Sequence, residues 1–259
     1  RDLPINGRIN RSVPINGTLI NTEINAIRDN TRTIQNLRFS YDYNINERIN
    51  IGTSITGYSN RYEMIEDKTS ENLNLNIEDL YYTTEENYWE NAQISVFSKY
   101  YISENTSFDI SFDFLKYDNN QPVEYVVALN SSEQIQNLNF KSYKASPFEI
   151  MVYNIDFESL LFNKIKFTAG FKMVDNDFIN ENSLSRDNIV DLNFDNYSSL
   201  SEEIIAGYSQ FNFDLSNKIS VQSGIRYEDT VTRIFDLNLN QIIVERSYGN
   251  FFPSVFIGY

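Results

Sequence analysis

The sequence contains neither cysteine nor histidine in its 259 residues. Without cysteine there can be no disulfide framework, thiolate metal site or thiol nucleophile. Without histidine the chain lacks the usual general base at neutral pH, the Ser-His-Asp arrangement and imidazole zinc sites. We therefore expect no enzymatic activity, no catalytic residues, no cofactor and no metal site.

Positive charge and long apolar runs are also scarce. Asp and Glu number 36 against 21 Lys and Arg, which gives a net charge of −15. Such a surface repels phosphate backbones, so nucleic acid is not expected as a partner. No uninterrupted apolar segment approaches the roughly 18 residues of a membrane helix, so any membrane crossing must use strands. The chain opens at Arg1 without Met or a signal peptide, so we expect a mature product or an internal piece of a longer protein.

The most informative pattern is a period of two, which places apolar and polar side chains on opposite faces of a strand. Apolar residues alternate with polar ones from Leu37 to Ile45, and again from Ile49 to Ile55 after a turn at residues 46–48. The same hairpin unit recurs three more times, and a ninth strand runs from Phe252 to Tyr259. The pattern predicts nine long antiparallel strands.

The connections between these strands are of two kinds. Short turns recur near Glu47, Glu104, Phe162 and Asn217. The other connections are long and polar, at about 60–88, 118–147, 176–201 and 229–250. Short turns at one end and long loops at the other are typical of bacterial outer-membrane barrels. The predicted fold is all-β: an antiparallel transmembrane up-and-down β-barrel, about nine strands of a larger barrel, with short periplasmic turns and long extracellular loops.

A soluble β-sandwich or lipocalin-like barrel would give the same alternation, with the apolar side chains inside. Three features favour a membrane: the strands are long, charged residues lie in mid-strand, and aromatic residues gather near strand ends. The polar residues predicted to face the lumen are Asp42, Asp109, Asp113, Lys166, Lys172 and Arg226. The aromatic residues predicted at the membrane interface are Tyr43, Tyr58, Trp89, Tyr100, Tyr117, Phe213 and Tyr227.

The first 36 residues differ from the rest. They contain a small repeat, Leu3-Pro4-Ile5-Asn6-Gly7 and Val13-Pro14-Ile15-Asn16-Gly17, in which Asn-Gly is a strong turn signal. A ligand-binding loop is one interpretation, but a turn-rich loop or edge hairpin is the simpler one. We therefore divide the chain into residues 1–36, such a loop or hairpin, and residues 37–259, the barrel segment.

Three stretches late in the chain carry a family resemblance: EEIIAGY at 202–208, KISVQSGIRYE at 218–228 and YGNFFPSV at 248–255. They resemble the TonB-dependent-receptor-like outer-membrane β-barrel family, over about residues 37–259 and most strongly after Tyr143. The resemblance implies an N-terminal plug inside a barrel of about 22 strands that imports scarce ligands with energy from the inner membrane. No plug, TonB box or closing strands are seen here, so it implies a middle segment of the barrel.

The expected location is the outer membrane of a Gram-negative cell, as a multi-pass β-barrel in contact with lipid. The leading hypothesis for function is energised uptake of a scarce ligand, a metal chelate, peptide or glycan, through the barrel. The resemblance also implies contact with the TonB complex through an N-terminal region outside these residues. The alternative is a non-transporting structural or assembly barrel that docks surface lipoproteins, other barrel subunits or secretion machinery. The ligand-binding residues are not predicted.

Overall fold

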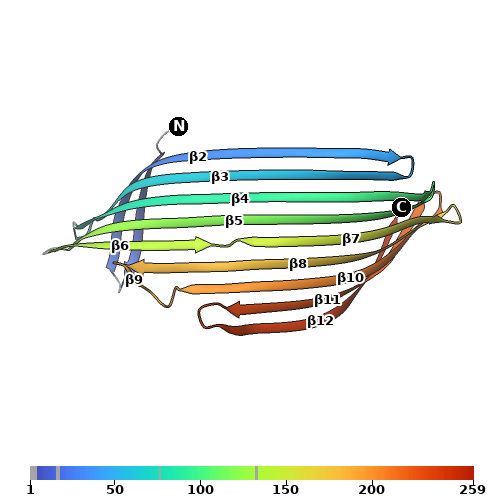
Figure 1. Cartoon of the computed structure of the whole chain (residues 1–259). Helices are drawn as coiled ribbons and strands as arrows, with labels where there is room; N and C mark the ends of the chain where they lie inside the picture. Colours follow the sequence, from blue (N-terminus) through green and yellow to red (C-terminus); the bar gives the residue numbers. More distant parts are fainter. Residues whose placement is uncertain (1–4, 16–17, 76, 132–133) are drawn as a thin grey trace.

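The computed structural model describes residues 5–15, 18–75, 77–131 and 134–259, and they form one antiparallel sheet of twelve strands (Figure 1). Within these residues no helix is long and apolar enough to cross a membrane. The strands are β1 (Ile5–Ile15), β2 (Thr18–Asn46), β3 (Ile49–Asn72), β4 (Ile77–Ser103), β5 (Thr106–Ser131), β6 (Gln134–Ala145), β7 (Phe148–Leu161), β8 (Ile165–Arg186), β9 (Ile189–Val190), β10 (Asn196–Ser216), β11 (Ile219–Asp236) and β12 (Gln241–Gly258).

Nine of these strands contain the nine predicted from alternation: β2, β3, β4, β5, β7, β8, β10, β11 and β12. The remaining three are the N-terminal strand β1, the two-residue β9, and β6. Both β6 and β7 pair with β5 and β8, so they form one line that is interrupted at Ser146-Pro147. Proline has no backbone N–H to donate to a ladder, which explains a break at this point.

The stretches predicted as long loops are largely strand. For example, β3 and β4 stay paired as far as Asn72 and Ile77, far past the point where the apolar alternation ends. The other polar stretches likewise extend β5 with β6, β8 with β10, and β11 with β12. Water can surround both faces of such an extension, so its sequence loses the simple alternation by which the strands were predicted.

The short turns are tight, as predicted. At the β7–β8 turn the Lys164 N–H donates to the Leu161 carbonyl at 3.0 Å, and the two central residues both have positive φ, 54° at Phe162 and 56° at Asn163. Positive φ at both central positions defines a type I′ turn, whose twist matches that of paired strands. Asparagine tolerates this backbone readily, whereas phenylalanine does not.

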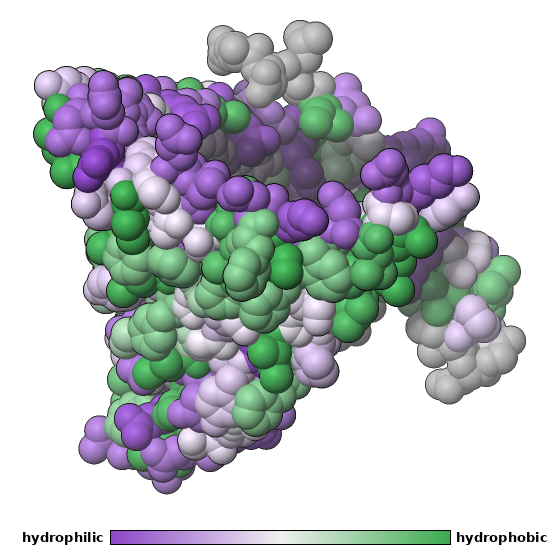
Figure 2. All heavy atoms as spheres, turned by 90° about the vertical axis from the view of Figure 1, so that its right-hand side faces the viewer, coloured by the Kyte–Doolittle hydropathy of each residue, from purple (hydrophilic) through white to green (hydrophobic). Residues whose placement is uncertain are grey.

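Continuous register joins the strands, so paired residues share a face of the sheet. One face carries the apolar members of the alternation on all nine long strands, and we call it the outer face. The other, the inner face, carries the polar members. The sheet curves, with β1 and the ends of β11 and β12 turning away from the plane of the central strands (Figure 1). Figure 2 shows hydrophilic side chains in the hollow at the top of the view and hydrophobic side chains on the surface below it.

The apolar side chains do not form a sealed core. Phe39 is 54% exposed and Ile110 is 48% exposed, and no large side chain in the described residues is fully buried. The apolar part of the outer face occupies residues 37–45, 49–57, 92–102, 106–114, 151–161, 165–173, 205–213, 219–227 and 251–257, which we call the belt. Each stretch is roughly nine residues long, enough to cross the hydrocarbon of a bilayer at a tilt.

Among the described residues β1 and β12 are the edge strands, and no pairing joins them. β1 pairs with the start of β2 from Ile5↔Arg28 to Ile15↔Thr18 and forms a hairpin at the sheet edge. Asn6-Gly7 lies inside β1, while Asn16-Gly17 and Leu3-Pro4 fall outside the described residues. Since β2 runs through residue 36 without a break, the division of the chain there stays a prediction.

Candidate functional site

The inner face of the belt is the main candidate site, because polar and charged side chains gather there. The register places all six predicted lumen residues on this face: Asp42, Asp109, Asp113, Lys166, Lys172 and Arg226. They come from four strands, β2, β5, β8 and β11, which are far apart in the sequence. That water fills the space they face stays a prediction.

A tyrosine connects three strands on this face. Tyr208 on β10 pairs directly with Gly170 on β8, and its hydroxyl donates to Asp156 Oδ1 on β7. The missing side chain of Gly170 makes this possible, since a Cβ there would lie 2.4 Å from the Asp156 carboxylate and 2.5 Å from the Tyr208 ring. Aromatic rings laid across a glycine of the next strand are a known means of fixing register.

Ion pairs lie on the same face as this tyrosine. The Arg226 guanidinium lies 5.7 Å from the Tyr208 ring centroid and donates to the Glu228 carboxylate. Toward the short turns, Lys99 Nζ lies 3.1 Å from Asp109 Oδ2, and Lys166 Nζ lies 2.9 Å from Glu158 Oε2. Both signs of charge therefore alternate across the inner face, a surface suited to hold water or a polar ligand and unsuited to lipid.

Four members of this network were not predicted: Lys99, Glu158, Tyr208 and Glu228. The available signal was the alternation along each strand, since odd-numbered and even-numbered residues lie on opposite faces. Lys99 stands at an odd position of β4 whereas Ala92, Ile94, Val96 and Tyr100 stand at even positions, so its place on the polar face could have been read from the sequence. The Tyr208–Gly170 pairing could not, because it depends on the register between strands.

The outer face of the belt carries four of the seven predicted interface aromatics. Tyr43, Tyr100, Phe213 and Tyr227 share it with the apolar residues, and the first three lie toward the short turns while Tyr227 lies toward the long hairpins. Tyr227 packs against Phe251 with ring centroids 4.8 Å apart and the two rings tilted by 50°. Contact of these residues with lipid headgroups stays a prediction.

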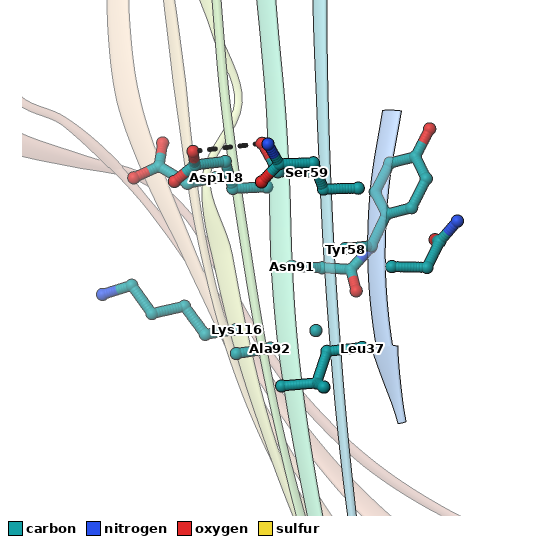
Figure 3. A pocket seen from close by; sticks show the side chains of 11 residues that line it. Leu37, Tyr58, Ser59, Asn91, Ala92, Lys116 and Asp118 are labelled. Atoms are coloured by element: carbon teal, nitrogen blue, oxygen red, sulfur yellow. Dashed lines mark hydrogen bonds between the residues drawn. The ribbon is translucent and has the colours of Figure 1, made fainter. Parts of the chain in front are cut away.

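The other three aromatics require a correction. Tyr58, Trp89 and Tyr117 lie on the inner face, because Tyr58 and Tyr117 both pair with Asn91, and Trp89 lies two residues before Asn91 on the same strand. In Figure 3 the Tyr58 ring points to the opposite side of the sheet from Lys116 and Asp118. The prediction considered only closeness to the strand ends, whereas the face of a strand residue follows from its parity.

The outer face changes abruptly from apolar to charged side chains at the edge of the belt nearer the long hairpins. Immediately beyond it, Lys116 Nζ pairs with Glu149 Oε1 at 2.7 Å, and Asp175 lies opposite Glu203. A shallow hollow marks the change, where Gly57 and Ala92 leave space beside Leu37 and below the hydrogen bond of 3.4 Å from Ser59 to Glu90 (Figure 3). We expect the bilayer boundary on the side of the long hairpins at this level.

Beyond the boundary the apolar residues are on the inner face of the sheet and the outer face is polar. The outer face of the long hairpins is charged, while the inner face buries Met64, Val127 and Leu138. A hollow of about 520 Å³ lies there, lined by apolar side chains such as Met64 and Val127 and also by charged ones. Among the charged ones, Arg28 Nη2 lies 2.6 Å from Glu66 Oε2. The Glu66 carboxylate raises the pKa of Arg28 above its ordinary value. Outside the membrane the sheet is thus arranged like that of a soluble protein.

No group of three or more Asp or Glu within the described residues is arranged to hold a metal ion. The acidic residues Asp175 and Asp177 lie on the outer face beyond the belt. Asp109 and Asp113 share the inner face of β5, where Asp109 pairs with Lys99. The chemistry on offer is recognition of polar groups by hydrogen bonds and paired charges.

Comparisons with known proteins agree with this geometry. No curated protein matches the sequence. The in-vitro folded OmpT, an outer membrane protein of Vibrio cholerae, aligns over 90% of this chain and 97% of its own length, at 6% identity and a TM-score of 0.27, too low to support an argument. A family model described as the outer membrane protein beta-barrel family matches residues 99–259, more than half of the chain. The chain therefore belongs to the outer membrane protein β-barrel family and is a multi-pass β-barrel protein of the cell outer membrane.

Proposed function

We propose that this barrel takes up a scarce ligand across the outer membrane, with energy supplied by the inner-membrane TonB complex. The observation that carries the proposal is the charged inner face of the belt, where ion pairs and amides from β4 to β11 face away from lipid. A barrel that only anchored partners would need no such lining. The stretches at 202–208, 218–228 and 248–255, which resemble TonB-dependent receptors, add support.

The test is a growth assay in the host with the full-length gene deleted. Cells are supplied with a metal chelate, a peptide or a glycan as the sole source of iron, nitrogen or carbon. We expect poor growth on one of the three, restoration by the wild-type gene, and the same defect when TonB is deleted instead. Normal growth of the deletion strain on all three, or a defect that does not require TonB, would contradict energised uptake.

A matched pair of variants links uptake to the inner face. Arg226→Gln breaks the contacts of Arg226 with Glu228 and Tyr208, whereas Lys116→Gln removes a cation on the outer face, where Lys116 pairs across to Glu149. We expect the first variant to slow uptake and the second to leave it unchanged. Stoichiometric co-purification of surface lipoproteins, together with normal uptake in both variants, would favour an assembly barrel.

A further inference from the structure

Just beyond the belt, the inner face carries two neighbouring rows of residues that pair across adjacent strands, and neither row contains a charged residue. The first row crosses the sheet from β2 to β10 and consists of Asn36, Tyr58, Asn91, Tyr117, Phe148, Phe178 and Leu200. The second crosses from β2 to β5 and consists of Ile34, Asn60, Trp89 and Asn119. In a chain in which 22% of residues are charged, these rows hold only aromatic, aliphatic and amide side chains.

Three aromatic residues surround one small amide in these rows. Tyr58 and Tyr117 flank Asn91 from the strands on either side, and Trp89 lies next to Asn91 along β4 on the same face. Tyr117 also stacks on Phe148, with ring centroids 4.8 Å apart and an interplanar angle of 19°. Burial raises the pKa of Tyr117, and the nearby Tyr58 raises it further.

An unsatisfied hydrogen-bond acceptor lies beside the aromatic residues. Asn87 precedes Trp89 by two residues on the same face and is only 4% exposed. Its Nδ2 donates to the Glu85 carboxylate, but its Oδ1 has no hydrogen-bond partner within the described part of the chain. A buried acceptor without a donor is costly, so this position suits a ligand that brings a hydroxyl or amide hydrogen.

These features define the chemistry of an occupant. Its apolar faces must stack on aromatic rings, its edges must carry hydrogen-bonding groups, and it must bring no net charge into rows whose own residues are uncharged. The Arg32 guanidinium at the border of the second row already donates to Asn60 Oδ1 at 3.1 Å. A chain of neutral sugars has all three properties, since each ring combines a face of C–H groups with an equatorial rim of hydroxyls. A metal chelate or an acidic glycan carries charge that these two rows do not match.

We infer that Tyr58, Trp89 and Tyr117, together with Asn87 and Asn91, form a binding site for a neutral oligosaccharide at the mouth of the barrel. This inference rests on the proposed function in that it names the ligand class to be taken up. The site lies on the inner face just beyond the bilayer boundary, between the water outside and the charged part of the inner face. A sugar bound there is placed at the entrance to the proposed path.

Trp89 provides the measurement, because it is the single tryptophan of the chain. The full chain, refolded in detergent, is titrated with maltohexaose, cellohexaose and xylohexaose, and the emission of Trp89 is recorded. Hexaglycine and a hexamer of galacturonic acid serve as neutral-peptide and acidic-sugar probes. We expect a saturable change in emission with at least one neutral hexasaccharide and none with the other two probes.

Variants test the position of the site. Tyr58→Ala and Tyr117→Ala each remove a ring and are expected to weaken binding roughly tenfold. The control is Tyr88→Ala, next to Trp89 in sequence but on the outer face, where Tyr88 lies under Arg61. Its binding is expected to match the wild type. Migration of each unheated sample as a folded barrel on a gel shows that the variants have folded.

Three results would overturn the inference: no saturable response to any of the three neutral hexasaccharides, a response to hexaglycine or the acidic hexamer alone, or equal binding by the wild type and both inner-face variants. The assay needs no cell and no energy source, so its outcome is separate from that of the growth assay. Sugar binding without uptake would support the binding site and contradict the proposed transport. Uptake of another nutrient without sugar binding would support transport and contradict the sugar site.

Discussion

Gly170 shows how strongly a single position can matter in this sheet. A Cβ at Gly170 would collide with both the Tyr208 ring and the Asp156 carboxylate, whereas a Cβ at Gly207, the neighbour of Tyr208 on the opposite face, meets nothing within 4 Å. Gly170→Ala is therefore expected to break the Tyr208–Asp156 hydrogen bond and to lower the free energy of unfolding by about 1–3 kcal/mol.

The measurement is urea unfolding of the barrel in detergent micelles, followed by loss of the folded band on a gel. Gly207→Ala is the control, because it adds the same methyl group to an open position, and it is expected to change stability by less than about 0.5 kcal/mol. If both variants unfold at the same urea concentration, the packing of Tyr208 over Gly170 contributes nothing measurable.

Asp177 offers a prediction for pH. Burial raises the pKa of Asp177, and the Asp175 and Glu149 carboxylates raise it further. Because the folded form holds the proton more tightly than the unfolded chain, this group favours folding at low pH, and its contribution is lost as pH rises through the folded pKa. Asp177→Asn is therefore expected to stabilise the protein at neutral pH, by on the order of 0.5 kcal/mol at this exposed site.

The stabilisation should disappear in acid, where the wild-type carboxyl is protonated. Thermal unfolding of wild type and variant across a pH series measures the difference. Asp67→Asn on the outer face of β3 is the matched control, since Asp67 is paired with Ile27 and Tyr82 and not with carboxylates. An equal gain in both variants at all pH values would show that the acidic neighbours of Asp177 play no part.

At the scale of the strand, the two faces of the belt should respond oppositely to charge. Ile110 on β5 is exposed on the outer face near the middle of the belt, and Ser111 beside it lies on the inner face. Ile110→Arg places a cation in hydrocarbon and is expected to cost about 2–4 kcal/mol, whereas Ser111→Arg faces the polar side and should cost less than about 1 kcal/mol.

Unfolding in urea of both variants, inserted in lipid vesicles, makes this comparison. Equal losses of stability for Ile110→Arg and Ser111→Arg would mean that the two faces of β5 meet similar surroundings. The assignment of the outer face to lipid would then be wrong.

The sequence was sufficient to predict the nine long strands, their antiparallel order and the tight turns, because in the belt one face meets lipid and the other does not, which enforces alternation. It was insufficient beyond the belt, where both faces of β3 and β4 tolerate polar residues and strand looks like loop. For single residues the limit was different. Parity would have placed Trp89 on the inner face, but nothing along the chain reveals that Tyr208 meets Gly170.

At the scale of the whole molecule, the orientation of the barrel can be tested, because the chain has no natural cysteine. Leu239 lies in the exposed connection between β11 and β12, at the end of the long hairpins, and Glu104 lies in the exposed short turn between β4 and β5. In intact cells we expect a membrane-impermeant maleimide to label Leu239→Cys and not Glu104→Cys, because the long hairpins face outward.

Lysed cells supply the control, since both variants should then be labelled to the same extent. Labelling of Glu104→Cys alone in intact cells would reverse the orientation. The proposed sugar site would then face the periplasm and could not be the entrance for an external nutrient.

The polar outer face of the long hairpins has a consequence for the cell surface. From Tyr58 to Asn72, β3 continues for roughly 50 Å at the rise of an extended strand. In the expected orientation this wall stands above the lipid as a tall collar whose flanks bear mostly acidic groups. Antibodies and phages approaching the bacterium would meet that collar first, and a small nutrient would have to descend inside it before reaching the membrane.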